Sequence, residues 1–378
     1  MERTATREQF SGATLYVAFD LGEQSWKLAM TVGLGQKPRV RTMRAGDLGS
    51  LVQELDRGRK RFGLAADSRV VSCFEAGRDG FWLHRFLQGI GVESHVVDAA
   101  SMEVTRRGRR VKTDRVDAEG LVRRLVRYDA GERKLWSVVR VPSIEDEDAR
   151  HLHRQLGTLK QEQTRLINRI KGLLASQGLR SQPRRRDFLP WLEQARLWDG
   201  SPLPPGLRSR IDIESQRLEL VRSQIRGLEQ ERKRLLEQSE AESLEKVRRL
   251  MQIKGIGTNC AWLLVMELFA WREFRNRKQV GSIAGLTPTP HQTGQSDREL
   301  GIDKAGNRRV RTMLVQIAWG WLRHQPDSAL SQWYERRFAE GPSRLRRIGI
   351  VALARKLLIA LWMWSEHGIV PEGAEIAA

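Results

Sequence analysis

The sequence predicts an α/β domain followed by helical domains, and three observations support this prediction. Short apolar runs alternate with helical segments over the first 140 residues, which is typical of an α/β sheet domain. Two long stretches then carry leucine and isoleucine at heptad spacing, as in a coiled coil. Beyond residue 246 helical patterns predominate. We therefore expect three domains in this chain of 378 residues, covering residues 1–140, 141–246 and 247–378.

The first domain is predicted to alternate strands and helices. Residues 14–31 form a pair of strands joined by a turn, and Asp20 ends the first of them. A helix over 47–63 precedes a strand over 68–74, and Glu75 follows that strand. A helix over 80–89 and a short strand over 93–97 complete the expected sheet domain.

Two helices are predicted to carry the heptad pattern. The apolar positions of the first are Leu152, Leu156, Leu159, Leu166, Ile170 and Leu173. A segment rich in proline and arginine follows at 183–206. The second set is Leu218, Val221, Ile225, Leu228 and Leu235, with Arg232 interrupting it. The helices can pair as an antiparallel hairpin or as a seam between two subunits, and spacing alone leaves both open.

The charge balance predicts an anionic partner. Sixty-six Lys and Arg residues oppose 46 Asp and Glu residues, which gives a net charge of +20. A field this positive attracts polyanions such as nucleic acid, although a solvated basic surface is the alternative. Two basic clusters are suited to follow a nucleic-acid backbone, with a solvated loop as the alternative. They are Arg106, Arg107, Arg109 and Arg110, just before Asp114, and Arg184, Arg185 and Arg186.

Nothing in the sequence predicts secretion or a membrane. The two cysteines, Cys73 and Cys260, are far apart and form no CxxC pair, which fits a reducing compartment. The first ten residues contain no apolar signal segment. The apolar stretch at 348–364 contains Arg355 and Lys356 and is predicted to be a buried helix. We expect a cytoplasmic protein without a membrane partner.

Four acidic residues of the first domain predict a metal site. Asp20 and Glu75 stand at strand ends, and Asp114 and Asp117 lie three residues apart at a predicted helix start, on one helix face. Four carboxylates in one place repel each other unless cations neutralise them, and oxygen-only ligands suit Mg²⁺ or Mn²⁺. Two such ions can activate an attacking oxygen and stabilise a leaving oxygen at phosphorus. Taken singly, these residues can also be a turn aspartate, a solvated strand end and a helix N-terminal charge.

The last domain carries a second candidate site. The segment from His291 to Ser296 is predicted to be a polar loop with two hydroxyl side chains, Thr293 and Ser296. The cations that follow can hold phosphate or stabilise charge that develops at phosphorus, although ordinary solvation of a helix is the alternative. They are Lys304, Arg308, Arg309 and Arg311.

A third candidate contact is the segment Ile253-Lys-Gly-Ile-Gly257, with Lys254 in it. It is suited to a DNA phosphate contact at a helix start, because its glycines let backbone N–H groups approach closely. A plain turn between two helices accounts for it equally well.

These motifs resemble those of the insertion-sequence one-ten transposase family, which is related to the Piv site-specific DNA invertases. The segments around Asp20 and Glu75, and Lys112-Thr-Asp-Arg-Val-Asp-Ala118, are similar to its RuvC-like half. The resemblance implies a ribonuclease-H-like domain in which Asp20, Glu75, Asp114 and Asp117 bind the catalytic metal. It further implies a transposase domain whose serine attacks DNA and becomes covalently joined to it. The family has serine before the glycine that is Gly294 here, whereas this chain has Thr293, so Thr293 and Ser296 both stay candidates.

The function expected from these features is DNA strand exchange by a transposase. The resemblance also implies a structured non-coding guide RNA, and the heptads indicate a homo-oligomer, either a dimer or a tetramer. One alternative is a metal-dependent nuclease or junction resolvase whose C-terminal loop only binds DNA. The other is a transposase derivative that binds nucleic acid without catalysis.

Overall fold

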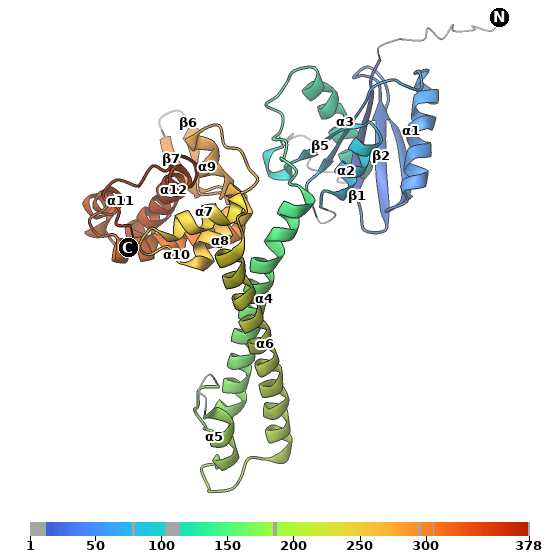
Figure 1. The fold of residues 1–378 in the computed structure, drawn as a ribbon. Helices are drawn as coiled ribbons and strands as arrows, with labels where there is room; N and C mark the ends of the chain where they lie inside the picture. The colour runs from blue at the N-terminus through green and yellow to red at the C-terminus, as the bar shows by residue number, and fades with distance from the viewer. Residues whose placement is uncertain are drawn as a thin grey trace, which may run out of the picture. The chain divides into compact units, whose positions relative to one another are not determined.

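The computed structural model describes residues 13–77, 80–102, 114–183, 187–293, 296–304 and 306–376, and it divides the chain into two compact units (Figure 1). The first unit is Met1–Pro142 and the second is Ser143–Ala378. The expected combination of an α/β part with a helical C-terminal part is confirmed.

The first unit is built on a mixed sheet of five strands in the order β3-β2-β1-β4-β5. The strands are β1 (Leu15–Leu21), β2 (Ser25–Thr31), β3 (Arg39–Arg44), β4 (Val70–Glu75) and β5 (Glu93–Val97). β1 pairs antiparallel with β2 and parallel with β4, while β3 and β5 form the edges. The sequence predicted four of these strands and missed β3.

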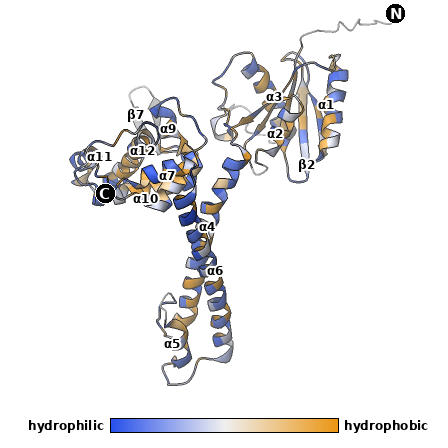
Figure 2. Cartoon of the chain, viewed as in Figure 1, coloured by the Kyte–Doolittle hydropathy of each residue, from blue (hydrophilic) through white to orange (hydrophobic). Residues whose placement is uncertain are grey.

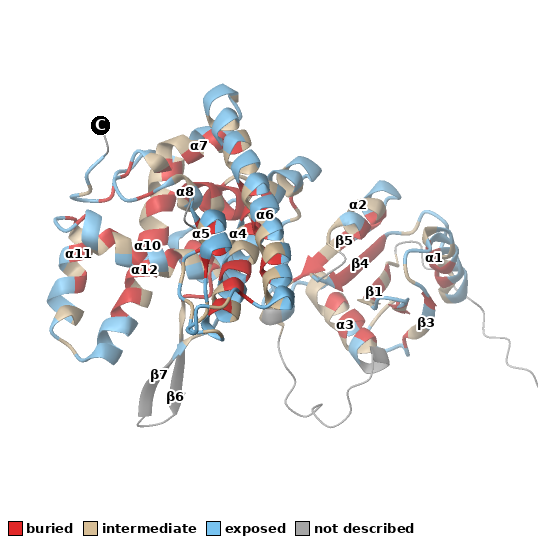
Figure 3. Cartoon of the chain, turned by 90° about the horizontal axis from the view of Figure 1, so that it is seen from below, coloured by how far each residue is buried: buried red, intermediate tan, exposed pale blue. Residues whose placement is uncertain are grey.

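Helices cover both faces of this sheet. Leu15, Val17 and Phe19 of β1 belong to a core with α1 (Leu48–Phe62) and α2 (Trp82–Gly89). The alternate residues, such as Ala18, pack on the other face with α3 (Asp114–Asp129). This alternation follows from the two-residue period of a strand. Figure 3 shows β4 as a buried strand, and only its last residue, Glu75, is exposed.

The second unit contains an antiparallel helical hairpin of α4 (Ile144–Ala175) and α6 (Pro205–Gln238). Lys160 pairs with Glu229, and Arg169 pairs with Glu214. Figure 2 shows apolar and polar residues alternating along both helices. Most of the apolar heptad positions form their shared core, whereas Leu152 and Leu235 pack against the core of the helical domain that follows. Of the two predicted arrangements, the structure contains the intramolecular hairpin.

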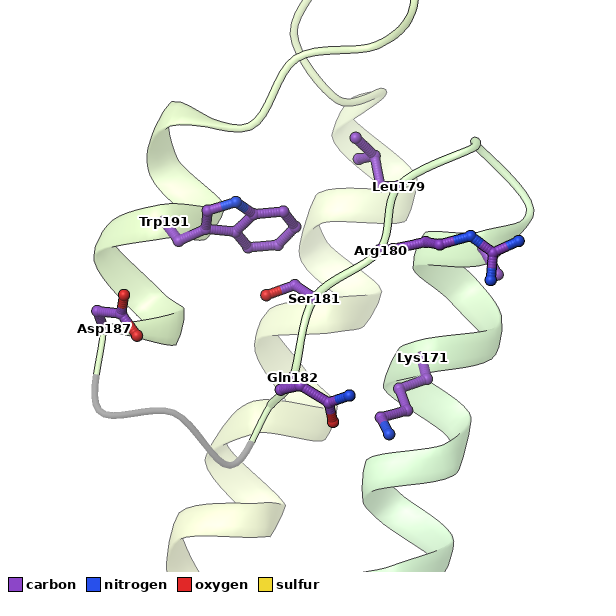
Figure 4. Close-up of a pocket in the computed structure, with 8 residues that line it drawn as sticks. Lys171, Leu179, Arg180, Ser181, Gln182, Asp187 and Trp191 are labelled. Atoms are coloured by element: carbon purple, nitrogen blue, oxygen red, sulfur yellow. The ribbon is translucent and has the colours of Figure 1, made fainter.

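The short helix α5 (Phe188–Gln194) packs against the end of this hairpin. A cavity of about 420 Å³ lies there, with Lys171 and Arg180 of the α4 side and Asp187 and Trp191 of the α5 side in its wall (Figure 4). Its wall carries both charge signs, so it favours no single class of ligand. Arg184, Arg185 and Arg186 lie outside the described residues.

The remainder of the second unit is a helical domain with a small β-hairpin. Its helices are α7 (Glu242–Met251), α8 (Thr258–Leu264), α9 (Arg277–Ile283), α10 (Arg308–His324), α11 (Ala329–Tyr334) and α12 (Ser343–His367). π-Helical segments, η3 (Val265–Phe269) and η4 (Glu335–Ala339), extend α8 and α11. One core joins these elements, with Trp262, Phe269 and Trp321 among its buried residues.

The segment predicted to be a polar loop, His291 to Ser296, lies instead in an antiparallel hairpin of β6 (Pro288–Thr293) and β7 (Ser296–Ile302). The prediction was wrong because prolines and polar residues usually disfavour strands, whereas a two-stranded hairpin tolerates them. A register shift between Pro288 and Pro290 accommodates the prolines.

Helix α12 is long and apolar enough to cross a membrane by length and composition, and half of that apolar window is buried in the unit. Leu353, Leu357 and Leu361 are fully buried in the common core. We therefore interpret α12 as a core helix, as the sequence predicted.

Candidate functional sites

Asp20 and Glu75 lie next to each other at the C-terminal ends of the neighbouring inner strands β1 and β4. β1 and β4 are parallel, and Phe19 is the register partner of Phe74, so the next residue of each strand comes to the same level. The two phenylalanines are buried on the α1 and α2 side. Because side chains alternate along a strand, Asp20 and Glu75 belong to the opposite face, which α3 covers.

Helix α3 brings Asp117 to the same place. Ala118, Leu121 and Leu125 are buried against the sheet and hold the helix over β1 and β4. Asp117 lies one turn before Leu121 and is exposed. Asp114 is the first residue of α3, as the predicted helix start requires, but its side chain lies outside the described residues.

These elements enclose a cavity of about 310 Å³ in the first unit. Asp20, Glu75 and Asp117 line it, together with Glu23 from the turn between β1 and β2. Sequence reasoning missed Glu23, although its position three residues after Asp20 was a usable signal. The structure thus brings three of the four predicted carboxylates to one cavity and adds a fourth from this turn.

The donor chemistry of this cavity fits a hard divalent cation. Carboxylate oxygens are the ligands that Mg²⁺ and Mn²⁺ prefer, and Glu75 and Asp117 are exposed to solvent. In the part of the chain that the structure describes, no group of three or more His, Cys, Asp or Glu side chains is placed to hold an ion. Cation binding here therefore requires the carboxylates to turn toward a common centre. Arg106, Arg107, Arg109 and Arg110 lie outside the described residues.

The second candidate site is the tip of the β6–β7 hairpin. Thr293 is the last residue of β6 and Ser296 is the first of β7, and the two are register partners. The backbone therefore brings both candidate hydroxyl residues to the same end of the hairpin. Their side chains lie outside the described set.

The loop between β7 and α10 has an unusually constrained backbone. Lys304 has a left-handed φ of 60°, and Gly306 has φ 89°. A Cβ at Gly306 would stand 2.1 Å from the carbonyl oxygen of Ile283, so only glycine fits there. Asn307 then caps α10, because its Oδ1 accepts from the N–H groups of Arg309 and Val310 at 3.0 and 3.3 Å.

The predicted cations near this loop fall into two groups. Lys304, Arg308 and Arg309 are exposed, so they can reach a phosphate. Arg311 is half-buried, and its Nη1 donates to the carbonyl oxygens of Ala284 and Lys304, both at 3.0 Å. The Arg311 guanidinium therefore stabilises the loop.

Lys254 is part of a packed turn. Its side chain pairs with Glu375, and its carbonyl oxygen accepts from Gln325 Nε2 at 2.9 Å. Gly255 has φ 90°, and a Cβ there would meet His324 at 2.9 Å. These contacts favour the alternative of a connecting turn over that of a DNA contact.

Sequence reasoning also missed the buried carboxylate of Glu267, which is 2% exposed. It accepts from His153 Nε2 at 3.0 Å, from Arg154 Nε and Nη2 at 2.8 Å each, and from Asn307 Nδ2 at 3.0 Å. Burial alone would raise its pKa, but the hydrogen bonds from His153 and Arg154 and their positive charge outweigh burial. The pKa of Glu267 therefore lies well below its usual range. An acid isolated in the apolar run 261–271 was the available signal.

Comparison with known proteins gives consistent matches. The family described as "Transposase IS116/IS110/IS902 family" matches residues 247–335. The chain is 44% identical over 374 residues to "Putative transposase y4rJ" of Sinorhizobium fredii, covering 95% of this chain and 94% of that protein. It is 28% identical to "Transposase for insertion sequence element IS1328" of Yersinia enterocolitica, over 68% of this chain and 73% of that one. The corresponding transposase of IS1111A from Coxiella burnetii is 26% identical, over 66% and 64%.

Proposed function

The chain belongs to the IS116/IS110/IS902 family of transposases, and we propose that it exchanges DNA strands with a carboxylate-bound metal and a hydroxyl nucleophile. The observation that carries this proposal is the cavity lined by Asp20, Glu75 and Asp117. Three acids that are far apart in the sequence line one small space, which a purely structural role does not require. The mixed sheet is compatible with a ribonuclease-H or RuvC-like domain.

In this proposal Asp20, Glu75, Asp114 and Asp117 hold Mg²⁺ or Mn²⁺. The bound cation would supply positive charge to a DNA phosphate and lower the pKa of an attacking group. The carboxylates orient the ion at the sheet edge, and the open cavity admits a phosphate. The exposed cations Lys304, Arg308 and Arg309 follow β7 at the base of the hairpin, where they are suited to bind DNA phosphates.

The nucleophile is proposed to be Ser296 or Thr293. Its hydroxyl oxygen forms an ester bond to phosphorus while the bond from phosphorus to one deoxyribose oxygen breaks. The hydroxyl proton passes to a base or water, and the departing oxygen takes up a proton. A second DNA hydroxyl can reverse this step, so strands are exchanged without loss of phosphodiester bonds. Ser296 is favoured because a primary hydroxyl is less hindered.

The carboxylates belong to the first unit and the β6–β7 hairpin to the second. The proposed reaction requires both to reach the same phosphate, either within one chain or across two subunits. We further propose, from the family resemblance, a homo-oligomer that uses a structured guide RNA in the cytoplasm. The net charge of +20 supports a nucleic-acid partner and does not distinguish RNA from DNA.

Trapping the covalent adduct tests this function. The full chain is incubated with Mg²⁺, a candidate guide RNA and DNA that carries the element ends and the target, and detergent-stable protein–DNA adducts are measured. Ser296→Ala should abolish the adduct if Ser296 attacks, and Thr293→Val should do so if Thr293 attacks. Ser282→Ala is the matched control, because Ser282 is an exposed serine whose hydroxyl donates to a carbonyl oxygen of its own helix. An undiminished adduct in the double variant would rule out the hairpin.

A metal-dependent nuclease is the second candidate, and Thr293 in place of the family's serine is the observation that favours it. Metal-dependent cleavage with no adduct in the unmodified protein would establish this alternative. Binding without cleavage would instead indicate a transposase derivative that has lost catalysis.

A further inference from the structure

A groove of about 1060 Å³ in the second unit runs along α12 from Ser343 to Ile359, beside the base of the β6–β7 hairpin. Gly301 and Ile302 of β7 line one side. The other side is a single face of α12, on which Arg344, Arg347 and Val351 recur at helical spacing. The opposite face of the same helix enters the core through Leu353 and Leu357. Helix α12 therefore has a second, solvent-facing surface that the sequence prediction of a buried helix did not include.

The groove is lined by five cations and no carboxylate. The cations are Lys304, Arg344, Arg347, Arg355 and Lys356. Among the described residues, no Asp or Glu lies within ion-pair distance of any of them. The described wall of the groove is therefore positively charged, which favours an anionic occupant.

Arg355 is held in the wall of the groove by its packing against α9. Its guanidinium lies against Gly281 of α9, where an added Cβ would stand 2.8 Å from Nε. The Nε atom is buried and has no hydrogen-bond acceptor among the described residues. This packing holds the Arg355 side chain in the wall of the groove, where its charge favours an anionic ligand.

The floor of the groove is aliphatic. Ile348 is 51% exposed, and Val351 and Ile359 are half-buried beside it. Exposed apolar surface rimmed by cations fits a ligand that offers both phosphate and a flat apolar face. An unpaired nucleotide offers both, whereas a duplex hides its base faces by stacking. A second copy of this chain is a poor occupant because its own net charge is +20.

We propose that this groove binds a single strand of DNA, with phosphates on the α12 arginines and bases against the aliphatic floor. That the strand is DNA rests on the proposed function, because the groove begins at the base of the β6–β7 hairpin, which carries the candidate nucleophile. The α12 arginines are assigned to a part of the strand that passes the base of the hairpin.

The test measures binding of a fluorescein-labelled 12-nucleotide single-stranded DNA by anisotropy across a range of salt concentrations. All proteins carry Asp20→Asn, so the measurement is independent of catalysis. The groove variant is Arg344→Gln with Arg347→Gln. The control is Arg346→Gln with Arg337→Gln, which removes the same charge from exposed positions outside the groove.

The groove variant should bind about tenfold more weakly near 0.1 M salt than its parent. The slope of log affinity against log salt should become shallower by about 1.4, since each lost single-strand phosphate contact contributes about 0.7. The control should keep a slope near that of the parent. Equal losses of affinity and slope in the two double variants would overturn the proposal.

A second comparison tests the aliphatic floor. Ile348→Ser with Val351→Ser should weaken binding of the normal strand about fivefold and leave binding of an abasic strand unchanged. Equal effects on both strands would refute base contact. If the groove substitutions weaken binding of duplex DNA as much as binding of the single strand, single-strand binding is refuted. If they weaken binding of RNA of the same sequence more, the ligand of the groove is RNA and not DNA. If the groove variant binds like its parent while the unmodified protein still forms the adduct, only this inference fails.

Discussion

Replacing Glu267 with glutamine tests whether one buried carboxylate holds the C-terminal domain together. The substitution keeps the shape but removes the charge that accepts four hydrogen bonds from His153, Arg154 and Asn307. It also leaves the guanidinium of Arg154 without its carboxylate. Breaking a buried pair in this way costs about 3 kcal/mol, so Glu267→Gln should destabilise the domain by about that amount at pH 7.

The pH dependence gives this prediction a second measurable outcome. The folded pKa of Glu267 lies well below its ordinary 4.5, so its stabilisation is fully present above pH 4.5 and is lost as pH falls toward the folded pKa. The difference in stability between the natural protein and Glu267→Gln should therefore have its full size at about pH 5.5. Below about pH 4.5 it should narrow by up to about 1.4 kcal/mol for each pH unit.

Hydrogen exchange followed by mass spectrometry provides the assay, because it reports local opening in a chain with two units. Peptides from the start of α4 and the start of α10 should exchange faster in Glu267→Gln. Glu245→Gln is the matched control, since Glu245 forms an exposed pair with Arg249 and should change stability by less than about 0.5 kcal/mol. A loss below about 1 kcal/mol at pH 7, or a difference between the two proteins that does not change with pH, would refute the reasoning.

Three further predictions follow from the geometry. Asp20→Asn should abolish metal-dependent strand exchange but leave the affinity for DNA within about twofold of that of the natural protein. The control is Asp67→Asn, which changes an exposed acid outside the cavity and should alter neither property. Strand exchange is measured by a cleavage assay and affinity by anisotropy. Gly306→Ala should destabilise the domain by about 2 kcal/mol in denaturant unfolding because of its positive φ and the 2.1 Å approach, whereas Gly320→Ala in open space within α10 should be neutral or stabilising. Sedimentation at micromolar concentration should show the proposed homo-oligomer, and a monomer with and without RNA would contradict it.

Much of the first unit could be predicted because its signals are local. The apolar runs at β1 and β4 and the residues that end them are visible in the sequence, and parallel pairing brings Asp20 and Glu75 together. Strand β3 was missed because it is an edge strand with arginine at both ends, and only Met43 in it is buried. A strand of this kind is stabilised by its pairing with β2, which no local pattern reveals.

The second unit was harder to predict because long-range contacts decide it. The β6–β7 hairpin contains two prolines and few apolar residues, so local propensity favours a loop. The solvent-facing side of α12 could not be predicted from composition. The apolar stretch at 348–364 contains only two cations, Arg355 and Lys356, and has the composition of a core helix. Its groove exists only because the hairpin base lies beside it.

Glu267 connects these elements in a way that its position in the sequence does not suggest. The carboxylate joins His153 and Arg154 of α4 to Asn307, and Asn307 caps α10 directly after the loop that follows β7. A displacement of α4 that broke its hydrogen bonds to Glu267 would therefore act on the residue that fixes the hairpin base. A buried hydrogen-bond network that is partly broken leaves polar groups without partners, which is costly. The start of α4 and the start of α10 should therefore unfold locally together and not independently. Glu267 thus links the start of α4 to the loop at the base of the hairpin that carries the candidate nucleophile.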